Sequence, residues 1–330
     1  MCAALALPFT MCRHKENPYS NYEEVAYEGD FGYRSYKDGV EIAEYTGSDD
    51  AVTVPADIAG KQVLSIGKEA FYKKDFTNIV LPDGIIEICE AAFAYSTLES
   101  AVIPDSVTKF SYSVFAGCKN LKSVNIPNGI TKIPLNMFNG CTSLESIEIP
   151  DSVTEIDHHA FSECGFTSIE IPSSVTTIGM SAFSYSNLES VVFPGSITKN
   201  HSFTFYSCQN LKSVKIQPGI TEISQYMFQS CKSLENVELP DGLTSISRSA
   251  FANCVNLKTV TIPDGVTEIY TGAFSECRSL ERINIPDSVT KIGGRNYEIF
   301  SNCRSIIITY KGTEYTYDER EKLYEIINGE

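Results

Sequence analysis

Hydrophobic and polar positions follow one repeating pattern along most of this chain. Its clearest mark is a column of phenylalanines with steps of 22 or 23 residues and one final step of 26. The column consists of Phe71, Phe93, Phe115, Phe138, Phe161, Phe183, Phe205, Phe228, Phe251, Phe274 and Phe300. Repeats of this length form solenoids in which each coil contacts only its neighbours. The pattern therefore predicts a solenoid of about eleven coils, each of 22–26 residues, over residues 55–309.

Within each coil, one segment alternates between inward and outward positions. In the coil that starts at Pro104, Val124 and Ile126 lie on one side of an extended chain, and Ser123 and Asn125 lie on the other. This alternation predicts a half-exposed strand that ends at the following proline-containing turn. The rest of the coil is expected to contain a short strand and one helical turn around an Ala-Phe pair. The predicted fold class is α/β, with a parallel sheet on one face and short helical turns on the other.

The residues before the repeats are expected to cover the first coil. Residues 31–54 contain two predicted strands joined by Lys37-Asp38-Gly39, and a third strand after Gly47-Ser48. We interpret 27–54 as an N-terminal β cap, because an uncapped solenoid would expose a hydrophobic cross-section. Residues 1–26 contain a short apolar run that basic residues follow instead of precede. Two interpretations stay open for them, the remnant of a signal peptide and a disordered tail.

A second cap is predicted at residues 310–330. A turn at Lys311-Gly312 separates two strands, and a helix follows. We expect Asp318 to cap this helix at its N-terminus. Its inner face is expected to consist of Leu323, Ile326 and Ile327.

Composition narrows the class of protein. The chain has 42 acidic and 26 basic residues and a formal net charge of −16, which disfavours nucleic acid and anionic membranes as partners. With 42% apolar and 21% charged residues, a folded chain is expected. No apolar stretch reaches the roughly 18 residues that a transmembrane helix needs, so no membrane insertion is predicted. The chain has 18 Phe, 18 Tyr and no Trp, which suggests that one aromatic position has been copied many times.

Cysteine is the most regular candidate for chemistry. Eight of the eleven cysteines lie three residues after a repeat phenylalanine, at Cys118, Cys141, Cys164, Cys208, Cys231, Cys254, Cys277 and Cys303. The sequence contains no C-x-x-C pair, which argues against a zinc ribbon or a thioredoxin-like site. Parallel Cβ vectors in a ladder do not converge as a disulfide requires. We therefore predict that these eight thiols are free, buried and inert.

No other pattern indicates a catalytic or metal centre. The His158-His159 pair lies on the variable turn before Phe161 and is predicted to be solvated; a metal site would need carboxylates from the adjacent coil. The motifs G-x-S-x-G, H-E-x-x-H, G-x-x-x-x-G-K-S/T and G-x-G-x-x-G are absent. We therefore predict no cofactor, no metal and no enzymatic activity. Asn200 replaces an isoleucine of other coils, so its amide should bond the neighbouring backbone or mark a local opening.

The repeat C-x-x-L-x-x-V-x-I-P-D-S/G-V-T-x-I-x-x-x-A-F closely resembles the BspA-like class of leucine-rich repeats, which is found mainly in bacterial surface proteins. The resemblance covers about three quarters of the chain. It implies a right-handed curved solenoid and a role in adhesion or protein recognition at a cell exterior. We expect a non-enzymatic, cell-surface or secreted protein that binds a protein or glycan as a monomer. The alternative is a structural role, in which molecules assemble into a surface layer.

The candidate binding surface is the exposed face of the predicted sheet. Its inner column keeps Val, Ile or Ala in successive coils, whereas the outer column changes from coil to coil. Glu148 and Glu170 lie on successive predicted strands, where like charges repel unless a basic partner relieves them. The alternative interpretation is that these side chains are only solvated strand residues. The candidate ligand-binding residues are Ser146, Glu148, Ser168, Glu170, Val192, Lys215 and Glu238.

Overall fold

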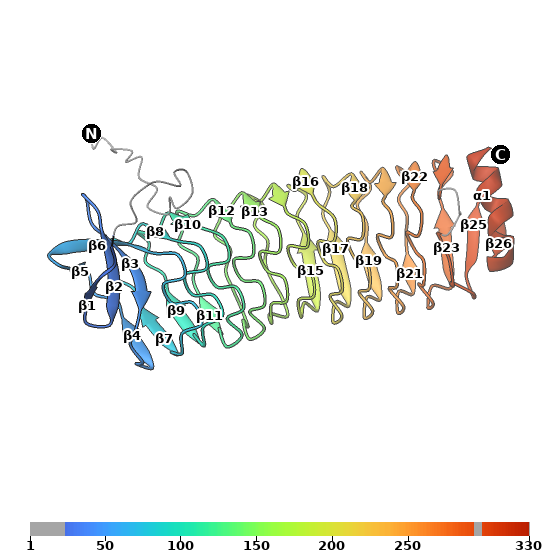
Figure 1. Ribbon diagram of the computed structural model, residues 1–330. Helices are drawn as coiled ribbons and strands as arrows, with labels where there is room; N and C mark the ends of the chain where they lie inside the picture. Colours follow the sequence, from blue (N-terminus) through green and yellow to red (C-terminus); the bar gives the residue numbers. More distant parts are fainter. Residues whose placement is uncertain (1–23, 294–298, 330) are drawn as a thin grey trace, which may run out of the picture.

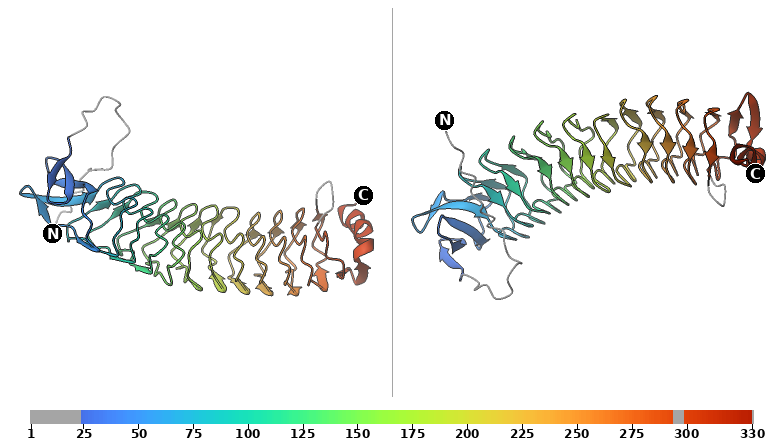
Figure 2. Two further views of the ribbon diagram at one scale, coloured as in Figure 1. Left: turned by 60° about the horizontal axis from the view of Figure 1, so that its bottom comes forward. Right: turned by 90° about the horizontal axis from the view of Figure 1, so that it is seen from above.

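The computed structural model describes residues 24–293 and 299–329 of the chain. The molecule is a curved rod built as a parallel β-solenoid of about twelve turns (Figure 2). Antiparallel strands lie at the N-terminal end of the rod, and a helix closes the C-terminal end (Figure 1). The predicted solenoid is confirmed. Among the described residues, α-helix occurs at the C-terminal end and not within the coils.

One side of the rod, which we call the sheet face, is formed by the L-x-x-V-x-I segments. Their inward Val and Ile side chains are packed in the core and their polar neighbours are exposed, as the alternation predicts. Equivalent residues of neighbouring coils pair in parallel register, such as Val191 opposite Val214. The strands of the sheet face are β4 (Ala51–Thr53), β7 (Asn78–Val80), β9 (Ser100–Val102), β11 (Ser123–Val124), β15 (Ser190–Phe193), β17 (Ser213–Ile216), β19 (Asn236–Glu238), β21 (Thr259–Val260), β23 (Arg282–Ile285) and β25 (Ile307–Tyr310).

A second ladder of parallel strands forms another side of the rod. Most of its members are the short strands predicted in the V-T-x-I segments, and each pairs two residues with the next coil. Its strands are β3 (Val40–Tyr45), β6 (Lys61–Ile66), β8 (Glu87–Ile88), β10 (Lys109–Phe110), β12 (Lys132–Ile133), β13 (Glu155–Ile156), β14 (Thr177–Ile178), β16 (Lys199–Asn200), β18 (Glu222–Ile223), β20 (Ser245–Ile246), β22 (Glu268–Ile269) and β24 (Lys291–Ile292). The ladder is interrupted between β10 and β12 and between β16 and β18.

The third side, which we call the turn side, differs from the predicted helical turn. Around each repeat phenylalanine the chain makes consecutive hydrogen-bonded turns, in which the described residues two positions before and two positions after the phenylalanine have positive φ. Beside Phe93, Ala91 and Tyr95 have φ of 52° and 59°. In these turns every second N–H is directed toward the next coil, so Phe93 donates to Val114 O at 3.0 Å and Tyr95 donates to Ala116 O at 2.8 Å. An α-helical turn would bond within itself, whereas these turns form a third ladder between coils.

The N-terminal end is built from antiparallel strands. β1 (Ala26–Glu28) pairs with β2 (Phe31–Ser35), and β2 pairs with β3 across the predicted Lys37-Asp38-Gly39 turn. β5 (Asp57–Ile58) forms a small antiparallel pair with β6. β3 and β4 also pair in parallel with β6 and β7, so they form the first turn of the solenoid. Most of the predicted tail at 1–26 lies outside the described residues.

The C-terminal end has the predicted strand, turn, strand and helix. β26 (Thr313–Thr316) pairs antiparallel with β25 and leads through the 3-10 helix η1 (Tyr317–Glu319) into α1 (Arg320–Asn328). The expected cap at Asp318 is wrong. The N-cap is Thr316, two residues before Asp318, and the Thr316 hydroxyl and backbone N–H both donate to the Glu319 carboxylate at 2.9 Å.

The buried face of α1 differs from the prediction at one residue. Leu323 and Ile327 are buried as expected, but Ile326 is 48% exposed and Tyr324 is buried in its place. Residues 323, 324 and 327 lie on one face of a helix, and so do the predicted residues 323, 326 and 327, so helical periodicity allows either set to be buried. Tyr324 brings a larger apolar ring, and it reaches the backbone of Phe300 at the end of the last coil.

The core contains a stack of repeat phenylalanines along the axis of the rod. Neighbouring rings from Phe71 to Phe300 lie 5.3–5.8 Å apart between centroids. The eight repeat cysteines lie beside this stack, and all are free and buried, which confirms the prediction. Each thiol donates to the carbonyl of the phenylalanine in the preceding coil, as Cys141 does to Phe115 O at 3.2 Å. The cysteines therefore act as small core residues.

Native protein is expected to resist thiol reagents. Burial raises the pKa of Cys118 to about 11 and that of Cys303 to about 12, so few thiolates form near neutral pH, and burial also blocks access. Titration with a thiol-specific chromogenic disulfide should label few of the eight repeat cysteines before denaturation and nearly all of them afterwards. Disulfides between neighbouring coils in a non-reducing peptide map would contradict this expectation.

Candidate functional site

All seven candidate residues lie on the sheet face with exposed side chains. The inner column beneath them is buried from Ala101 to Val214, apart from the half-buried Ile147. The structure thus has a regular core column under a surface column that varies. It does not bring all seven residues together, because they divide between two hollows along this face.

The predicted strand is missing from two coils of the sheet face, and Figure 1 draws no arrow between β11 and β15 there. Within the described part of the chain, residues 146–149 and 168–171 make no backbone-to-backbone hydrogen bond. Asn125 takes part in this opening, because its side-chain amide accepts from Ile103 N at 2.7 Å and donates to Ile103 O at 2.8 Å. A longer β11 would have bonded Ile103 N–H, which this side chain takes instead, and Pro127 has no N–H to donate to Ile103 O. The strand ends at Val124.

The interruption changes the expected setting of Glu148 and Glu170. They lie on the two unpaired segments, and the prediction that they occupy successive paired strands is wrong. Their like charges oppose a close approach of the two segments. The backbone N–H and C=O groups of these segments stay open to solvent or to a ligand.

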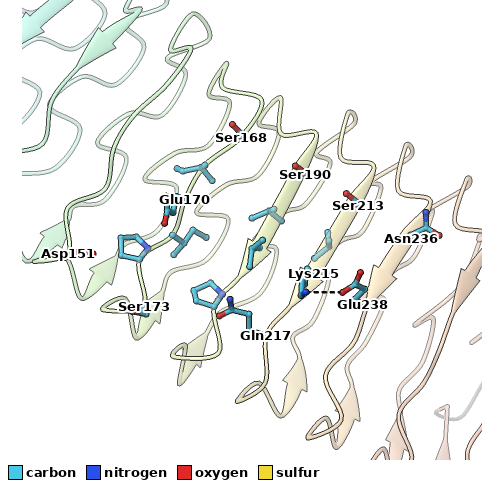
Figure 3. Close-up of a pocket in the computed structure, with 17 residues that line it drawn as sticks. Asp151, Ser168, Glu170, Ser173, Ser190, Ser213, Lys215, Gln217, Asn236 and Glu238 are labelled. Atoms are coloured by element: carbon cyan, nitrogen blue, oxygen red, sulfur yellow. Dashed lines mark ion pairs between the residues drawn. The ribbon is translucent and has the colours of Figure 1, made fainter.

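The larger hollow has a volume of about 640 Å³ and extends from residues 168–171 to β19. Figure 3 shows Ser168, Ser190 and Ser213 in a row on successive coils. These small side chains let a ligand approach the strand backbone closely. The hollow contains five of the seven candidates: Ser168, Glu170, Val192, Lys215 and Glu238.

One ion pair crosses the floor of this hollow. Lys215 Nζ lies 3.7 Å from Glu238 Oε2, and the two side chains are 62% and 72% exposed. Such an exposed pair contributes about 0–1 kcal/mol to stability. A ligand can therefore replace either partner at little cost to the fold.

Besides Ser190 and Ser213, four polar residues of the hollow were not among the seven candidates, namely Asp151, Ser173, Gln217 and Asn236. Gln217 had a detectable signal, because it replaces the proline that follows the strand in neighbouring coils, such as Pro194 and Pro240. Its N–H donates to Phe193 O at 2.9 Å, which a proline could not do. β15 and β17 consequently pair over four residues. Asp151 and Ser173 stand at the turn position after the proline, which is aspartate in most coils, and Asn236 follows a column that is serine from Ser100 to Ser213. Ser173 and Asn236 therefore also interrupt a column, whereas Asp151 follows the consensus and carried no signal.

Ser146 and Glu148 lie in the second hollow, which has a volume of about 510 Å³. It also contains Asn125, Asn128 and Val102, whose side chain is 75% exposed. The open segments 146–149 and 168–171 thus contribute to neighbouring hollows on one face.

His158 and His201 belong to another side of the rod. His158 Nδ1 lies 2.6 Å from Asp157 Oδ1, and its ring centroid lies 5.4 Å from that of His201. Burial opposes ionisation of Asp157, but hydrogen bonds from Lys132 and His158 lower its pKa to about 2. Over residues 24–293 and 299–329, no group of three or more His, Cys, Asp or Glu side chains is arranged to hold a metal ion. In the same ranges, no helix has the length and apolar character needed to cross a membrane.

Of the two alternatives expected for Asn200, the structure shows the local opening, because the second ladder is interrupted between β16 and β18. The side chain does not bond the neighbouring backbone but bonds other side chains. Its amide donates to Ser224 Oγ of the next coil at 3.0 Å, and its carbonyl accepts from Thr204 Oγ1 at 2.7 Å. The half-buried amide is thus satisfied by polar neighbours that replace the apolar contacts of an isoleucine. These bonds give Asn200 a structural role.

The family is shown by the repeats themselves. The family model described as the BspA type leucine rich repeat region matches residues 64–188, 131–254 and 176–307, which together span most of the chain. This chain belongs to the BspA-type leucine-rich repeat family. The phenylalanine column and the sheet face described above are therefore features of a BspA-type solenoid. A comparison with curated proteins finds no significant match.

Solved structures of bacterial leucine-rich repeat proteins share this fold. A leucine-rich repeat protein from Bacteroides ovatus is 24% identical, with 85% of this chain and 92% of that chain covered and a TM-score of 0.58. A leucine rich cell surface protein from Faecalibacterium prausnitzii is 28% identical, with 92% and 98% covered and a TM-score of 0.52. The pneumococcal vaccine antigen PcpA is 16% identical, with 94% and 97% covered and a TM-score of 0.55.

Proposed function

We propose that this BspA-type protein is a non-enzymatic recognition protein, displayed on a bacterial cell or secreted from it, that binds a protein or glycan through its sheet face. The observation that carries the proposal is the hollow over β15, β17 and β19. There, variable and exposed side chains stand above a regular core column, beside coils whose backbone groups are open. A recognition surface needs both a rigid support and side chains that can change without loss of the fold.

The charges of the hollow favour a basic ligand. Asp151, Glu170 and Glu238 outnumber the one cation of the hollow, Lys215. Glu148 adds a further carboxylate in the neighbouring hollow. A basic partner would relieve the repulsion between Glu148 and Glu170 and would be attracted by the negative charge of the whole chain.

One comparison supports a location outside the cytoplasm. The Faecalibacterium prausnitzii relative is described as a cell surface protein and is similar over 92% of this chain.

Replacing both Glu148 and Glu170 by lysine is expected to abolish ligand capture without unfolding the protein. The two side chains are exposed, so the substitution reverses the charge of the surface and leaves the core unchanged. Pull-down from extracts of host cell surfaces, read by mass spectrometry, measures capture by wild type and variant. Capture by the wild type should also weaken as salt is raised, because exposed charges are screened.

A matched control is the double variant Glu321→Lys and Glu325→Lys. It makes the same change in net charge on the exposed surface of α1, at the end of the rod, and should still capture the same partner. Equal capture by the Glu148 and Glu170 variant and by the wild type would refute the sheet-face assignment. Open-ended growth in a concentration series of light-scattering masses, without capture of any partner, would favour a surface-layer role.

A further inference from the structure

The turn side carries a separate hollow of about 410 Å³, which crosses the coils from Tyr72 to Glu163. Two of its rings are well exposed: Tyr95 is 56% and Tyr112 is 46% accessible. Its floor consists of small residues, namely Ala91, Ala94, Ser113, Ala116, Gly117 and Gly140. Exposed rings beside such a floor offer flat apolar surface to a ligand.

The Tyr95 ring is held in place as a platform. A Cβ atom on Gly117 would lie 2.5 Å from both Cδ1 and Cε1 of Tyr95, so the ring rests directly on the glycine backbone. Tyr72 contacts the ring edge-on, with centroids 5.8 Å apart. A ring fixed in this way loses little conformational entropy when a ligand stacks on it.

Backbone conformation alone does not explain glycine at this place. The residue two positions after the repeat phenylalanine has positive φ in every described coil, and Tyr95, Glu163 and Ser207 adopt it with side chains. Gly117 and Gly140 follow each other in this column, so two successive coils lack the side chain that the other coils carry. The Tyr95 ring occupies the space at Gly117, and the space at Gly140 stays open, so the hollow continues from Tyr95 to Glu163.

Hydrogen-bonding groups line the rest of the hollow. The Tyr112 phenol donates to Glu90, which raises the pKa of Tyr112 and fixes its ring. On the opposite side, Asn139 Nδ2 donates to Asn136 Oδ1 at 3.3 Å. Each amide offers more donors and acceptors than this one bond uses, and the Glu163 carboxylate lies beside them.

We propose that this hollow binds a neutral oligosaccharide, with one pyranose face stacked on Tyr95 and its hydroxyl groups bonded by Asn136, Asn139 and Glu163. A pyranose matches these walls because it carries apolar C–H groups on its faces and hydroxyl groups around its edge. Anionic glycans do not match, because the carboxylates of Glu90 and Glu163 outnumber the one cation of the hollow, Lys119, and the chain carries a net charge of −16. This site lies on a different side of the rod from the proposed sheet-face site and does not depend on it.

Binding is tested with an array of immobilised neutral and acidic glycans, followed by titration calorimetry with the neutral oligosaccharide that gives the strongest signal. The full-length wild type should bind neutral glycans. Tyr95→Ala should weaken binding about tenfold through loss of the stacked ring. Gly117→Ser should have a comparable effect, because its side chain displaces the Tyr95 ring; the backbone accepts serine here, as Ser207 shows in the same column.

Tyr185→Ala is the matched control. Tyr185 occupies the same position of its coil, has the same φ of 59° as Tyr95, is 53% exposed and contacts Tyr206 edge-on at 5.3 Å. Its loss should leave the affinity unchanged. All three variants should keep the wild-type circular dichroism and melting temperature within a few degrees.

Several results would overturn the assignment. They are the absence of binding to any neutral glycan on the array, binding confined to acidic glycans, and equal loss of affinity in the Tyr95 and Tyr185 variants. The Glu148 and Glu170 double lysine variant separates the two proposals, because it should lose sheet-face capture and still bind the neutral oligosaccharide. If that variant loses oligosaccharide binding while Tyr95→Ala keeps it, the glycan site lies on the sheet face.

Discussion

Removal of residues 311–330 is expected to make the protein aggregate. This segment contributes β26 and α1, whose Leu323, Tyr324 and Ile327 side chains are buried against the last coil. Burial of such side chains stabilises a fold by about 1.5–3 kcal/mol each, and the deletion would also uncover Phe300 and Ile306. The lost stability is comparable with that of a whole typical domain, roughly 5–15 kcal/mol. Light-scattering masses and melting temperatures of the full-length and truncated proteins measure the effect.

Single substitutions on α1 test whether the helix stabilises the last coil through its buried side chains. Leu323→Ala should lower the free energy of unfolding of the C-terminal coils by about 2–5 kcal/mol, because it leaves a cavity. Ile326→Ala, on the exposed face of the same helix, should change it by less than about 0.5 kcal/mol. Urea unfolding followed by circular dichroism compares the two.

A truncated protein that stays monomeric and keeps the wild-type melting temperature would show that the helix is not needed to stabilise the solenoid. Equal losses for Leu323→Ala and Ile326→Ala would contradict the observed orientation of α1. Asn328 provides a third check at the helix end, because its amide donates to Ile292 O at 3.1 Å and accepts from Ile292 N at 3.0 Å. Asn328→Ala should therefore also destabilise the last coil, by about 1–3 kcal/mol for the unpaired backbone groups.

The coil architecture could be predicted from the sequence because the same pattern of inward and outward positions recurs in every coil. Eleven phenylalanines and eight cysteines in fixed relation leave one consistent assignment of inward positions. The conformation around the Ala-Phe pair could not be predicted, because periodicity cannot distinguish a helical turn from turns that contain positive-φ residues on both sides of the phenylalanine. The difference depends on where each N–H finds its acceptor, and those acceptors lie in the next coil, about 22 residues away in the sequence.

The candidate site could be predicted from the sequence only in part. Alternation was sufficient to place Glu170, Lys215 and Glu238 on the exposed side of the strands. It could not predict that the Asn125 side chain would bond the backbone of Ile103 where β11 ends, because that depends on a side-chain bond between two coils. The hollow around Tyr95 was missed for a similar reason, since two glycines 23 residues apart become neighbours only when the coils stack.

The interrupted ladders identify one weak interface in the rod, between the coils of Phe115 and Phe138. No strand pair crosses it on the sheet face, and β10 does not pair with β12 on the second side. Pro134 explains the second interruption, because the equivalent Asp157 donates its N–H to Ile133 O at 2.9 Å, and proline has no N–H. The interface is held by the turn-side ladder, as in Phe115 N to Met137 O at 3.0 Å, and by the ring stack at 5.6 Å.

Phe138→Ala is therefore expected to divide the unfolding of the protein into two transitions. The substitution should cost about 3–5 kcal/mol, and it removes the ring contacts to Phe115 and Phe161, which lie at 5.6 and 5.5 Å. In a solenoid, stability is approximately a sum of coil and nearest-neighbour contributions. Weakening an interface that has already lost both strand ladders should let the coils on its two sides unfold separately. Urea unfolding by circular dichroism, with limited proteolysis to identify the surviving half, measures this.

Phe251→Ala is the matched control for the interface. It creates an equivalent cavity, because Phe251 is also fully buried and stacks on both neighbours at 5.4 Å. Strand pairs nevertheless cross both adjoining interfaces, between β19 and β21 and between β20 and β22. We expect a similar loss of stability but a single transition, since these ladders keep the neighbouring coils coupled. One transition for Phe138→Ala, or two transitions for both variants, would show that the ring stack and the turn ladder couple the coils as strongly as paired strands do.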